Sequence, residues 1–394
     1  MRSRILNILV MRKFMTCLLI LLLFLGCSQK QERVERTKED GVEVVINHTE
    51  PYKIKGQPTT IELKKEFSID TGKDTTAELG LVDIGKYFDV DPQGNVYLVS
   101  LMGKGNTIFK FDKQGNFITS FGHRGQGPGE LVSRRFPPLF LTIHKEDQIV
   151  VTNYYRRKLV YFNLEGDFIR EEKLDSNLTL LAVISLPNGN YLAYENRGGP
   201  SYEMPLSLFS HDFKKIKELG FRKIPDIGEE KIKGIYYMFS WALSGDKIFT
   251  GKQEQGYVIN VYDLKGQLIR KIKKEYKPAP LTNEFKEKYL EIYKNIEDYR
   301  NKIYFPKNFP PFHSFFTDHK ERLFVMTYEK GENPGEHMYD IFNEDGLFIG
   351  RKSLRIHYNS DSLFARMKNN RLYCIYEKES GYKEFTAYKV TWKE

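Results

Sequence analysis

The sequence predicts an all-β protein, a six-bladed β-propeller with four-stranded blades. Two observations lead to this fold class. A strand–turn–strand unit recurs six times along the 394 residues, and a second hairpin unit follows each of the first five copies. In addition, 25 Tyr and 28 Phe give a composition that favours strands. Two hairpin units contain four strands, the size of one propeller blade.

The first unit joins a strand that ends near Asp to a strand rich in Tyr, Val or Ile. Its copies are 88–100, 141–153, 182–196, 240–253, 315–329 and 364–378. The second unit turns through Asp or Asn followed by Gly, whose backbone tolerates the positive φ of such turns. Its copies are 108–122, 159–174, 206–221, 258–274 and 338–354. The third copy has Phe213 where the others have the turn glycine.

The sixth blade is one strand short at the C-terminus. After 364–378 only the segment 384–393 remains, whereas a spare strand, 60–70, precedes the first blade. We expect this N-terminal strand to complete the last blade, because the pairing ties the two ends of the propeller together and removes a sheet edge.

An insertion, 275–313, separates the fourth and fifth blades. It contains apolar residues at alternating spacings of three and four, which predict an amphipathic helix with Asn283 as its N-cap. These residues are Phe285, Tyr289, Ile292, Ile296, Tyr299 and Ile303. We expect the helix to pack on the propeller as a lid or brace, with a partner or ligand surface as the alternative.

The N-terminal segment predicts export and a lipid anchor. Arg12 and Lys13 precede the apolar run 18–25, which is too short for a stable membrane span, and Gly26 and Cys27 follow. This pattern is similar to a bacterial lipoprotein signal, in which the cysteine is acylated. An ordinary signal peptide or a membrane-anchored N-terminus is the alternative. Ser28, rather than Asp, argues against retention in the inner membrane.

Cysteine content and charge exclude two classes of protein. With Cys17 in the signal and Cys27 lipidated, Cys374 is left alone, so no intramolecular disulfide can form. Residues 1–26 hold four of the 61 basic residues and no acidic one, so 57 basic and 52 acidic residues give the remainder a net charge of +5. These charges are interspersed, which does not support nucleic-acid binding.

Residues 90–131 resemble an NHL-type propeller repeat, with "DPQGNVYLV", "FDKQGNF" and "FGHRGQGPGE" in order. More narrowly, the chain resembles the six-bladed β-propeller lipoproteins of Bacteroidetes over residues 59–394. The resemblance implies a lipoprotein signal peptide (1–26), a flexible tether (27–58) and a propeller (59–394). Because propellers host unrelated functions, it implies no single activity.

In a propeller, the crossings between blades and the loops between second and third strands share one face, which we call the loop-bearing face. We predict ligand contacts from its polar and aromatic side chains, because Tyr and Arg supply rigid area and planar donors at interfaces. The candidates are His123, Glu130, Tyr154, Tyr155, Arg156, Arg197, Tyr202, Tyr257 and His337. For Tyr155 and Arg156 a purely structural role is an equal alternative, and for Arg157 we expect one.

The sequence provides no catalytic motif. Glu130 follows the glycine run 122–129 where a phosphate loop needs Lys and a hydroxyl, no G-x-S-x-G occurs, and the eight histidines form no H-x-x-x-H pair. We therefore predict no catalytic residue, no metal ligand and no cofactor. Asp83, His313 and Asp361 are polar candidates near the axis; a structural role is expected for each, with Ca²⁺ in the central channel left open.

We expect a non-enzymatic, monomeric lipoprotein of the bacterial envelope, anchored in the outer membrane through its lipid alone. Its loop-bearing face would bind a protein, peptide or glycan, and no nucleic acid. The alternative is a propeller enzyme, either a Ca²⁺-dependent lactonase-like hydrolase or an NHL-type lyase.

Overall fold

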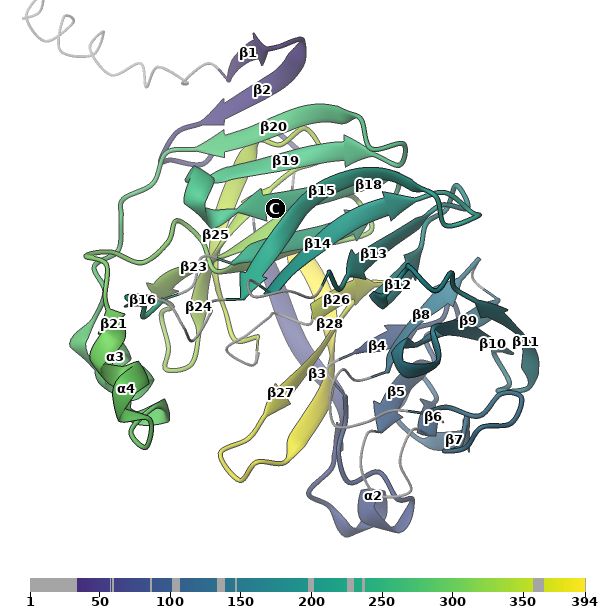
Figure 1. Ribbon diagram of the computed structural model, residues 1–394. Helices are drawn as coiled ribbons and strands as arrows, with labels where there is room; N and C mark the ends of the chain where they lie inside the picture. Colours follow the sequence, from purple (N-terminus) through teal and green to yellow (C-terminus); the bar gives the residue numbers. More distant parts are fainter. Residues whose placement is uncertain are drawn as a thin grey trace, which may run out of the picture. The chain divides into compact units, whose positions relative to one another are not determined.

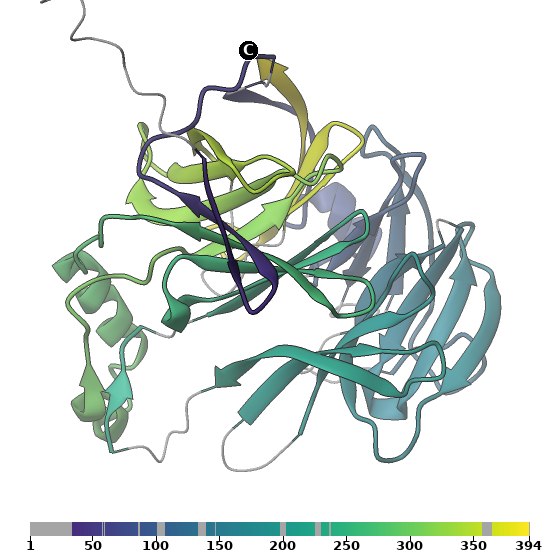
Figure 2. The same cartoon turned by 90° about the horizontal axis from the view of Figure 1, so that it is seen from above.

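The computed structural model describes residues 34–393 apart from 57, 59, 86, 101–106, 133–138, 146, 198–201, 225–229, 236–237 and 357–364. Six antiparallel four-stranded blades follow one another along this part of the chain (Figure 1). In the view from above, their colours run in order from slate blue through teal and green to yellow (Figure 2). The predicted six-bladed propeller is confirmed. Residues 1–26 and Cys27 lie outside the described residues.

In the first three blades the strands pair in chain order. Blade one contains β4 (Phe88–Val90), β5 (Val96–Ser100), β6 (Thr107–Phe111) and β7 (Phe117–Phe121). Blade two contains β8 (Phe140–His144), β9 (Gln148–Asn153), β10 (Lys158–Asn163) and β11 (Phe168–Lys173). Blade three contains β12 (Leu180–Ser185), β13 (Tyr191–Glu195), β14 (Tyr202–Phe209) and β15 (Lys215–Ile224).

The remaining blades follow the same plan, and the last one takes its fourth strand from the N-terminal side. Blade four contains β17 (Phe239–Ser244), β18 (Lys247–Lys252), β19 (Val258–Asp263) and β20 (Leu268–Lys274). Blade five contains β22 (Ser314–Thr317), β23 (Leu323–Lys330), β24 (His337–Phe342) and β25 (Phe348–Leu354). Blade six contains β26 (Ala365–Lys368), β27 (Arg371–Glu377), β28 (Lys383–Lys393) and β3 (Thr60–Asp70). A short helix, α2 (Asp74–Glu78), leads from β3 toward blade one.

The hydrophobic core lies between successive blades. Phe88 of blade one packs with Phe385 of blade six, at 5.1 Å between ring centroids, within one buried cluster. Phe121 of blade one packs on Phe162 of blade two at 5.2 Å in the next cluster. Neighbouring blades cover both faces of the middle strands, so β5 and β6 are buried along their whole length, whereas the outer strands β7 and β11 keep exposed positions.

The turns at the opposite end of the blades close as the Asp/Asn–Gly pattern predicts. Asp112 Oδ1 accepts the backbone N–H groups of Gln114 and Asn116, both at 2.8 Å, and Asp263 and Asn343 act in the same way. Gly166 has φ +98°, and a Cβ there would collide with the ring of Phe121. Phe213 adopts the same left-handed region, φ 57°, and stacks on Tyr191 at 4.6 Å.

The predicted closure of blade six is confirmed, since β3 pairs antiparallel with β28 along its whole length. A buried carboxylate, Glu384 of β28, accepts hydrogen bonds from Lys65 Nζ of β3 at 2.6 Å and from Tyr376 OH at 2.5 Å. Burial disfavours the charged carboxylate, but these hydrogen bonds and one from Ser68 outweigh it and lower the pKa of Glu384 to about 2.

Replacing Glu384 by glutamine is expected to lower the free energy of unfolding by about 1 kcal/mol at pH 7, because water partly screens Lys65. A carboxyl group with a lowered pKa stabilises the fold while it is ionised. The difference between variant and wild type should therefore disappear as the pH falls from 4.5 toward 2. Urea unfolding at several pH values measures this. Glu62→Gln, at the exposed end of the same strand pair, is the control, and a pH-independent difference for Glu384→Gln would contradict the assignment.

The expectation of a flexible tether up to residue 58 is wrong for its described part. β1 (Glu35–Glu39) and β2 (Val42–Asn47) form a hairpin, and β2 pairs parallel with β20, which extends the blade-four sheet to six strands. Asp40 and Gly41, with φ 50° and 82°, make the hairpin turn. An Asp-Gly pair between two segments of alternating polar and apolar residues favours a tight hairpin turn, so the sequence already contained the signal for this hairpin.

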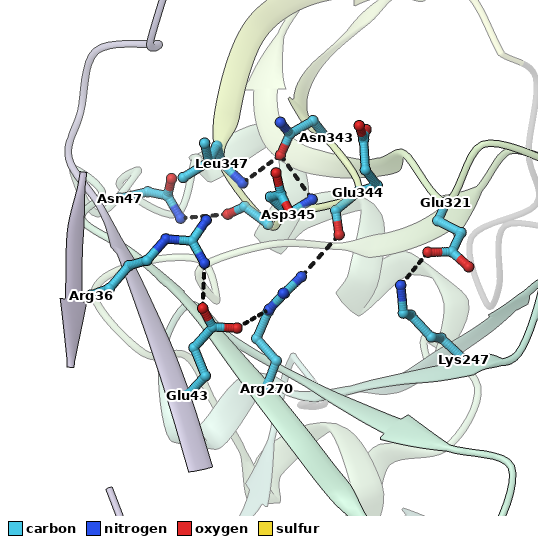
Figure 3. A network of polar contacts seen from close by, with 11 residues as sticks. Arg36, Glu43, Asn47, Lys247, Arg270, Glu321, Asn343, Glu344, Asp345 and Leu347 are labelled. Carbon is cyan, nitrogen blue, oxygen red and sulfur yellow. Dashed lines mark hydrogen bonds and ion pairs between the residues drawn. The ribbon is translucent and has the colours of Figure 1, made fainter. Parts of the chain in front are cut away.

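The hairpin is fixed to both neighbouring blades by polar contacts (Figure 3). Glu43 accepts a hydrogen bond from Arg270 Nε at 2.6 Å, and Arg270 Nη1 also donates to the carbonyl of Glu344 in blade five at 2.9 Å. The buried side chain of Asn47 donates to the carbonyls of Lys273, in blade four, and Gly346, in blade five. The segment therefore joins the outer strands of blades four and five.

The insertion contains two short helices where one was expected, α3 (Asn283–Ile292) and α4 (Glu297–Lys302). The N-cap is Thr282, whose hydroxyl accepts the N–H of Phe285, so Asn283 as N-cap was wrong by one residue. After α4, β21 (Ile303–Tyr304) pairs with β16 (Ile232–Lys233) in a parallel two-stranded sheet.

The apolar stripe of the insertion packs on the insertion's own C-terminal part and reaches the propeller through it. Phe285 contacts Phe309 at 5.2 Å between centroids, and Phe309 stacks on Tyr328 of β23 at 4.6 Å. The expected bracing contact is thus made through Phe309. Ile292 at the end of α3 and Ile296 before α4 are 71 % and 52 % exposed, so these two residues of the predicted stripe are not packed in this way.

Candidate functional site

The glycine-rich crossing from blade one to blade two, residues 121–130, is organised by contacts within itself. Glu130 accepts the N–H of Gly127 at 2.6 Å, and a side chain at Gly125 would collide with the Glu130 carboxylate. Gly129 has φ +73° and lies against Phe168 of β11, so the glycines allow close packing of the crossing on blade two. Glu130 therefore has a structural partner in its own loop, whereas His123 is exposed.

The predicted contacts of blade two lie in the loop between β9 and β10. Tyr154, Tyr155 and Arg156 form a 3-10 turn, η1, in which the two tyrosine rings meet edge to face at 5.3 Å. Asn196 donates to the Tyr154 hydroxyl at 2.9 Å, which ties this turn to blade three. Arg156 is exposed. Arg157 donates to the carbonyl of Ser176 at 2.8 Å, a bracing contact of the kind expected for it.

Blades three and five hold three more predicted residues. Arg197 is exposed and forms an ion pair with Glu218 of β15. Tyr202 begins β14, and its side chain lies outside the described part. His337 begins β24, and burial lowers its pKa below the usual 6.5, so the imidazole is neutral at pH 7. The nine candidates are therefore distributed along the loop-bearing ends of five blades.

Tyr257 is the candidate that lies in a cavity, at the loop-bearing end of blades four and five. The cavity has a volume of about 200 Å³. Its walls come from the residue before β19, the ends of β20 and β23, strands β24 and β25, the insertion, and the segment after β2. The residues that matter below are Tyr257, Lys274, Tyr276, Glu329, Asp340 and Arg351.

Charges of alternating sign line this cavity, with Lys274 and Asp340 buried and Arg351 and Glu329 partly exposed. Asp340, 1 % exposed, accepts a hydrogen bond from Tyr257 OH at 2.8 Å and one from Arg351 Nε at 2.9 Å. Lys274 Nζ lies 3.5 Å from the same carboxylate, and Arg351 Nη2 lies 2.8 Å from Glu329 Oε1. The order Lys274, Asp340, Arg351 and Glu329 is thus a continuous chain of two cations and two anions. We call it the ion-pair chain.

Burial and neighbouring charges fix the ionisation of this cluster. Burial, with the Asp340 carboxylate next to it, raises the pKa of the Tyr257 hydroxyl far above 10, so it remains a hydrogen-bond donor. Burial alone would lower the pKa of Arg351, but hydrogen bonds and attraction from Glu329 and Asp340 outweigh it and raise that pKa. Arg351 therefore stays protonated, and the two basic and two acidic side chains of the ion-pair chain balance in formal charge.

Asp340, Lys274 and Arg351 were not among the site residues predicted from the sequence. Each lies in a strand, at a position that fits the usual alternation of polar and apolar residues. A signal was available, since the "NEDG" turn sets the register in which Asp340 of β24 faces Arg351 of β25. Lys274 could not be assigned to them, because the approach of β20 to blade five depends on the tertiary packing.

Blades three and four enclose a second hollow, of about 290 Å³, between β15 and β18–β19. Phe221, Phe239 and Tyr262 supply its aromatic surface, and Lys252 Nζ lies 4.4 Å from the centre of the Phe221 ring. None of the predicted contact residues whose side chains the structure describes lines it. The Lys252 ammonium is thus placed over an aromatic ring as part of the packing between the two blades.

Two of the three polar candidates near the axis have structural partners. Asp83 pairs with Lys383 Nζ at 2.8 Å, and His313 Nδ1 lies 3.0 Å from the Ser314 hydroxyl. Asp361 lies outside the described residues. Among the residues that the structure describes, no group of three or more His, Cys, Asp or Glu side chains is arranged to hold a metal ion. No described helix is both long and apolar enough to cross a membrane.

Comparison with known proteins identifies the fold. The model of DUF5128, described as a 6-bladed beta-propeller, matches residues 74–220. A DUF4221 family member from Bacteroides vulgatus superposes with a TM-score of 0.50 at 14% identity, over 85% of this chain and 100% of that one. A streptogramin B lyase (TM-score 0.38, 10% identity, 78% of each chain) and a Staphylococcus aureus virginiamycin B lyase (0.39, 12%, 83% and 99%) are more distant. No curated protein matches the sequence. The chain is a six-bladed β-propeller.

Proposed function

We propose that this protein is a non-enzymatic binding lipoprotein of the bacterial envelope, anchored in the outer membrane through Cys27. Its loop-bearing face would engage a protein, peptide or glycan. The observation that carries the proposal is the cavity between blades four and five at that face, which contains the predicted contact residue Tyr257. Concave sites lined by aromatic side chains and a few fixed polar groups are where ligands bind.

The fixed bonding of the polar groups supports binding rather than chemistry. In the cavity, Asp340 receives hydrogen bonds from Tyr257 and Arg351, and Arg351 is held by Glu329. Both carboxylate oxygens of Asp340 are therefore already engaged, which leaves this group poorly placed to act as a base on a bound ligand. The site is a rigid polar surface, which suits recognition.

Partner contact can be located with a photoreactive phenylalanine analogue placed in the full-length protein in intact cells. At Tyr276, on the cavity wall, irradiation is expected to give an adduct with the partner. At Phe117, an exposed aromatic at the opposite end of blade one, it is expected to give none. Equal labelling at both positions, or no adduct at 276, would count against a binding site at the loop-bearing face.

Replacing Cys27 by alanine is expected to move the protein from the membrane fraction to the soluble fraction, because lipidation of this residue would be its membrane anchor. Fractionation followed by immunoblotting measures this. Cys374→Ala is the matched control, since Cys374 is buried in β27 and should leave partitioning unchanged. If the Cys27→Ala protein stays in the membrane fraction, the lipoprotein proposal is wrong.

A further inference from the structure

We infer that the cavity between blades four and five accepts a single uncharged, polyhydroxylated ring, such as a neutral sugar residue of a glycan. This rests on the proposed function and specifies the ligand class. Three features of the cavity carry the inference: the balanced charges of its ion-pair chain, the hydrogen-bonding character of its walls, and its size together with its tyrosine rings.

The ion-pair chain disfavours a charged ligand. Lys274, with a side chain 6 % exposed, and Arg351 flank Asp340, and Arg351 also binds Glu329, so each of these charges faces an opposite one. Glu50 and Lys277, which also line the cavity, add one charge of each sign. A phosphate, carboxylate or ammonium group would bring an uncompensated charge to a lining whose own charges are balanced, which is unfavourable.

The same walls suit hydroxyl groups. Nε and Nη2 of Arg351 bind Asp340 and Glu329, and these two bonds use two of the five N–H groups that a guanidinium carries. Glu329, at the mouth, binds Arg351 through one carboxylate oxygen, Oε1. Each hydroxyl of a sugar can donate to a carboxylate and accept from a guanidinium at once, so it can bind to the ion-pair chain while the existing ion pairs remain.

Size and shape favour one ring. The volume of about 200 Å³ lies below the roughly 300–1,000 Å³ of pockets for drug-sized ligands. Tyr276 is 38 % exposed, and its ring centroid lies 6.0 Å from that of Tyr257. The ring of Tyr328 is held in place by its stack on Phe309. The exposed ring of Tyr276 offers flat apolar area at low conformational cost, which matches the C–H face of a pyranose. Pro310 and Pro311 make a further wall rigid.

The test uses the full-length protein, solubilised in detergent, on a surface that carries three probe sets. These are glycans ending in neutral hexoses, glycans ending in uronic or sialic acid, and peptides of matched length. Wild type is expected to retain neutral glycans in preference to the other two sets. Ala279→Phe, which fills the cavity from a half-buried position on its wall, is expected to weaken this at least tenfold.

Two further variants make the result decisive. Tyr276→Ala should also weaken retention, and because the residue is exposed the fold should tolerate it. Tyr382→Ala, an exposed tyrosine on a blade-six loop, should not. Thermal unfolding verifies that each variant is folded. Retention of acidic glycans or peptides that Ala279→Phe abolishes would overturn the inference while leaving the proposed function standing, and so would neutral-glycan retention that Ala279→Phe does not change. No retention of neutral glycans also overturns it, and if position 276 in addition gives no adduct in cells, the proposed function fails as well.

Discussion

Replacing Asp340 by alanine is expected to lower the free energy of unfolding by about 3–5 kcal/mol. The carboxylate is buried and is the shared partner of Lys274, Arg351 and the Tyr257 hydroxyl. Its removal leaves the buried Lys274 ammonium and the Tyr257 hydroxyl without their acceptor, whereas Arg351, with a side chain 35 % exposed, keeps its ion pair with Glu329. Breaking one member of a buried ionic network costs more than the network contributes as a whole, because desolvated charges remain.

Urea unfolding followed by circular dichroism measures this loss. Asp345→Ala, an exposed aspartate in the turn that follows β24, is the matched control and should change stability by less than about 0.5 kcal/mol. Asp340→Asn should fall between the two, because its amide oxygen can still accept from Tyr257. If Asp340→Ala lowers the free energy of unfolding by less than about 1 kcal/mol, the ion-pair chain does not have the role in stability described above.

Replacing Asn47 by alanine is expected to cost about 2–4 kcal/mol, because several buried backbone groups lose their partner. Asn47 is fully buried, and its Nδ2 donates to the carbonyls of Lys273 at 3.1 Å and Gly346 at 3.0 Å. Its Oδ1 accepts the N–H of Phe348 at 2.8 Å. One side chain thus satisfies groups of two blades, and its loss also loosens the hairpin from blade five.

Asn188→Ala provides a matched comparison. Asn188 also bonds across two blades, to the carbonyl of Leu264 at 3.0 Å, but it is exposed, so water can replace its amide. We expect a loss below about 0.5 kcal/mol for this variant. In Asn47→Ala, amide hydrogen exchange of residues 35–47 should accelerate. Equal losses in the two asparagine variants, or unchanged exchange in the hairpin, would contradict the role given to Asn47.

Besides Tyr257 and Lys274 of blade four, three other parts of the chain line the cavity, and this bears on how the proposed site is assembled. Thr49 and Glu50 follow the N-terminal hairpin, Tyr276 and Ala279 belong to the insertion, and Asp340 lies in blade five. Loss of the hairpin contacts made by Asn47 should therefore alter ligand retention as well as stability. A site assembled in this way is not visible in any one repeat.

Local sequence patterns were sufficient for the repeating part of the fold. Turns such as 112–116 depend on one Asp and one Gly within five residues, so they read directly from the sequence. The apolar character of the middle strands follows from burial between blades. The pairing of 60–70 with the last blade followed from counting strands, since one blade lacked a strand and one strand lacked a blade.

The candidate site was only partly predictable. Tyr257 was found because it lies in a loop of the expected face, where polar and aromatic residues stand out. Glu130 was nominated for the same reason, but its carboxylate binds its own loop, since a backbone N–H three residues away is its nearest donor. Loop position alone does not distinguish a side chain directed at a ligand from one that stabilises the loop.

By itself, the sequence determined the number of blades, their closure and the loop-bearing face, because these depend on contacts between residues close in the chain or on a repeated pattern. Only the tertiary structure decided that residues 35–47 join blade four, and that Lys274, Asp340 and Arg351 meet around one cavity. Lys274 and Asp340 are far apart in sequence, and the packing of two blades and an inserted segment brings them together. That packing depends on the shape of whole surfaces rather than on any local pattern.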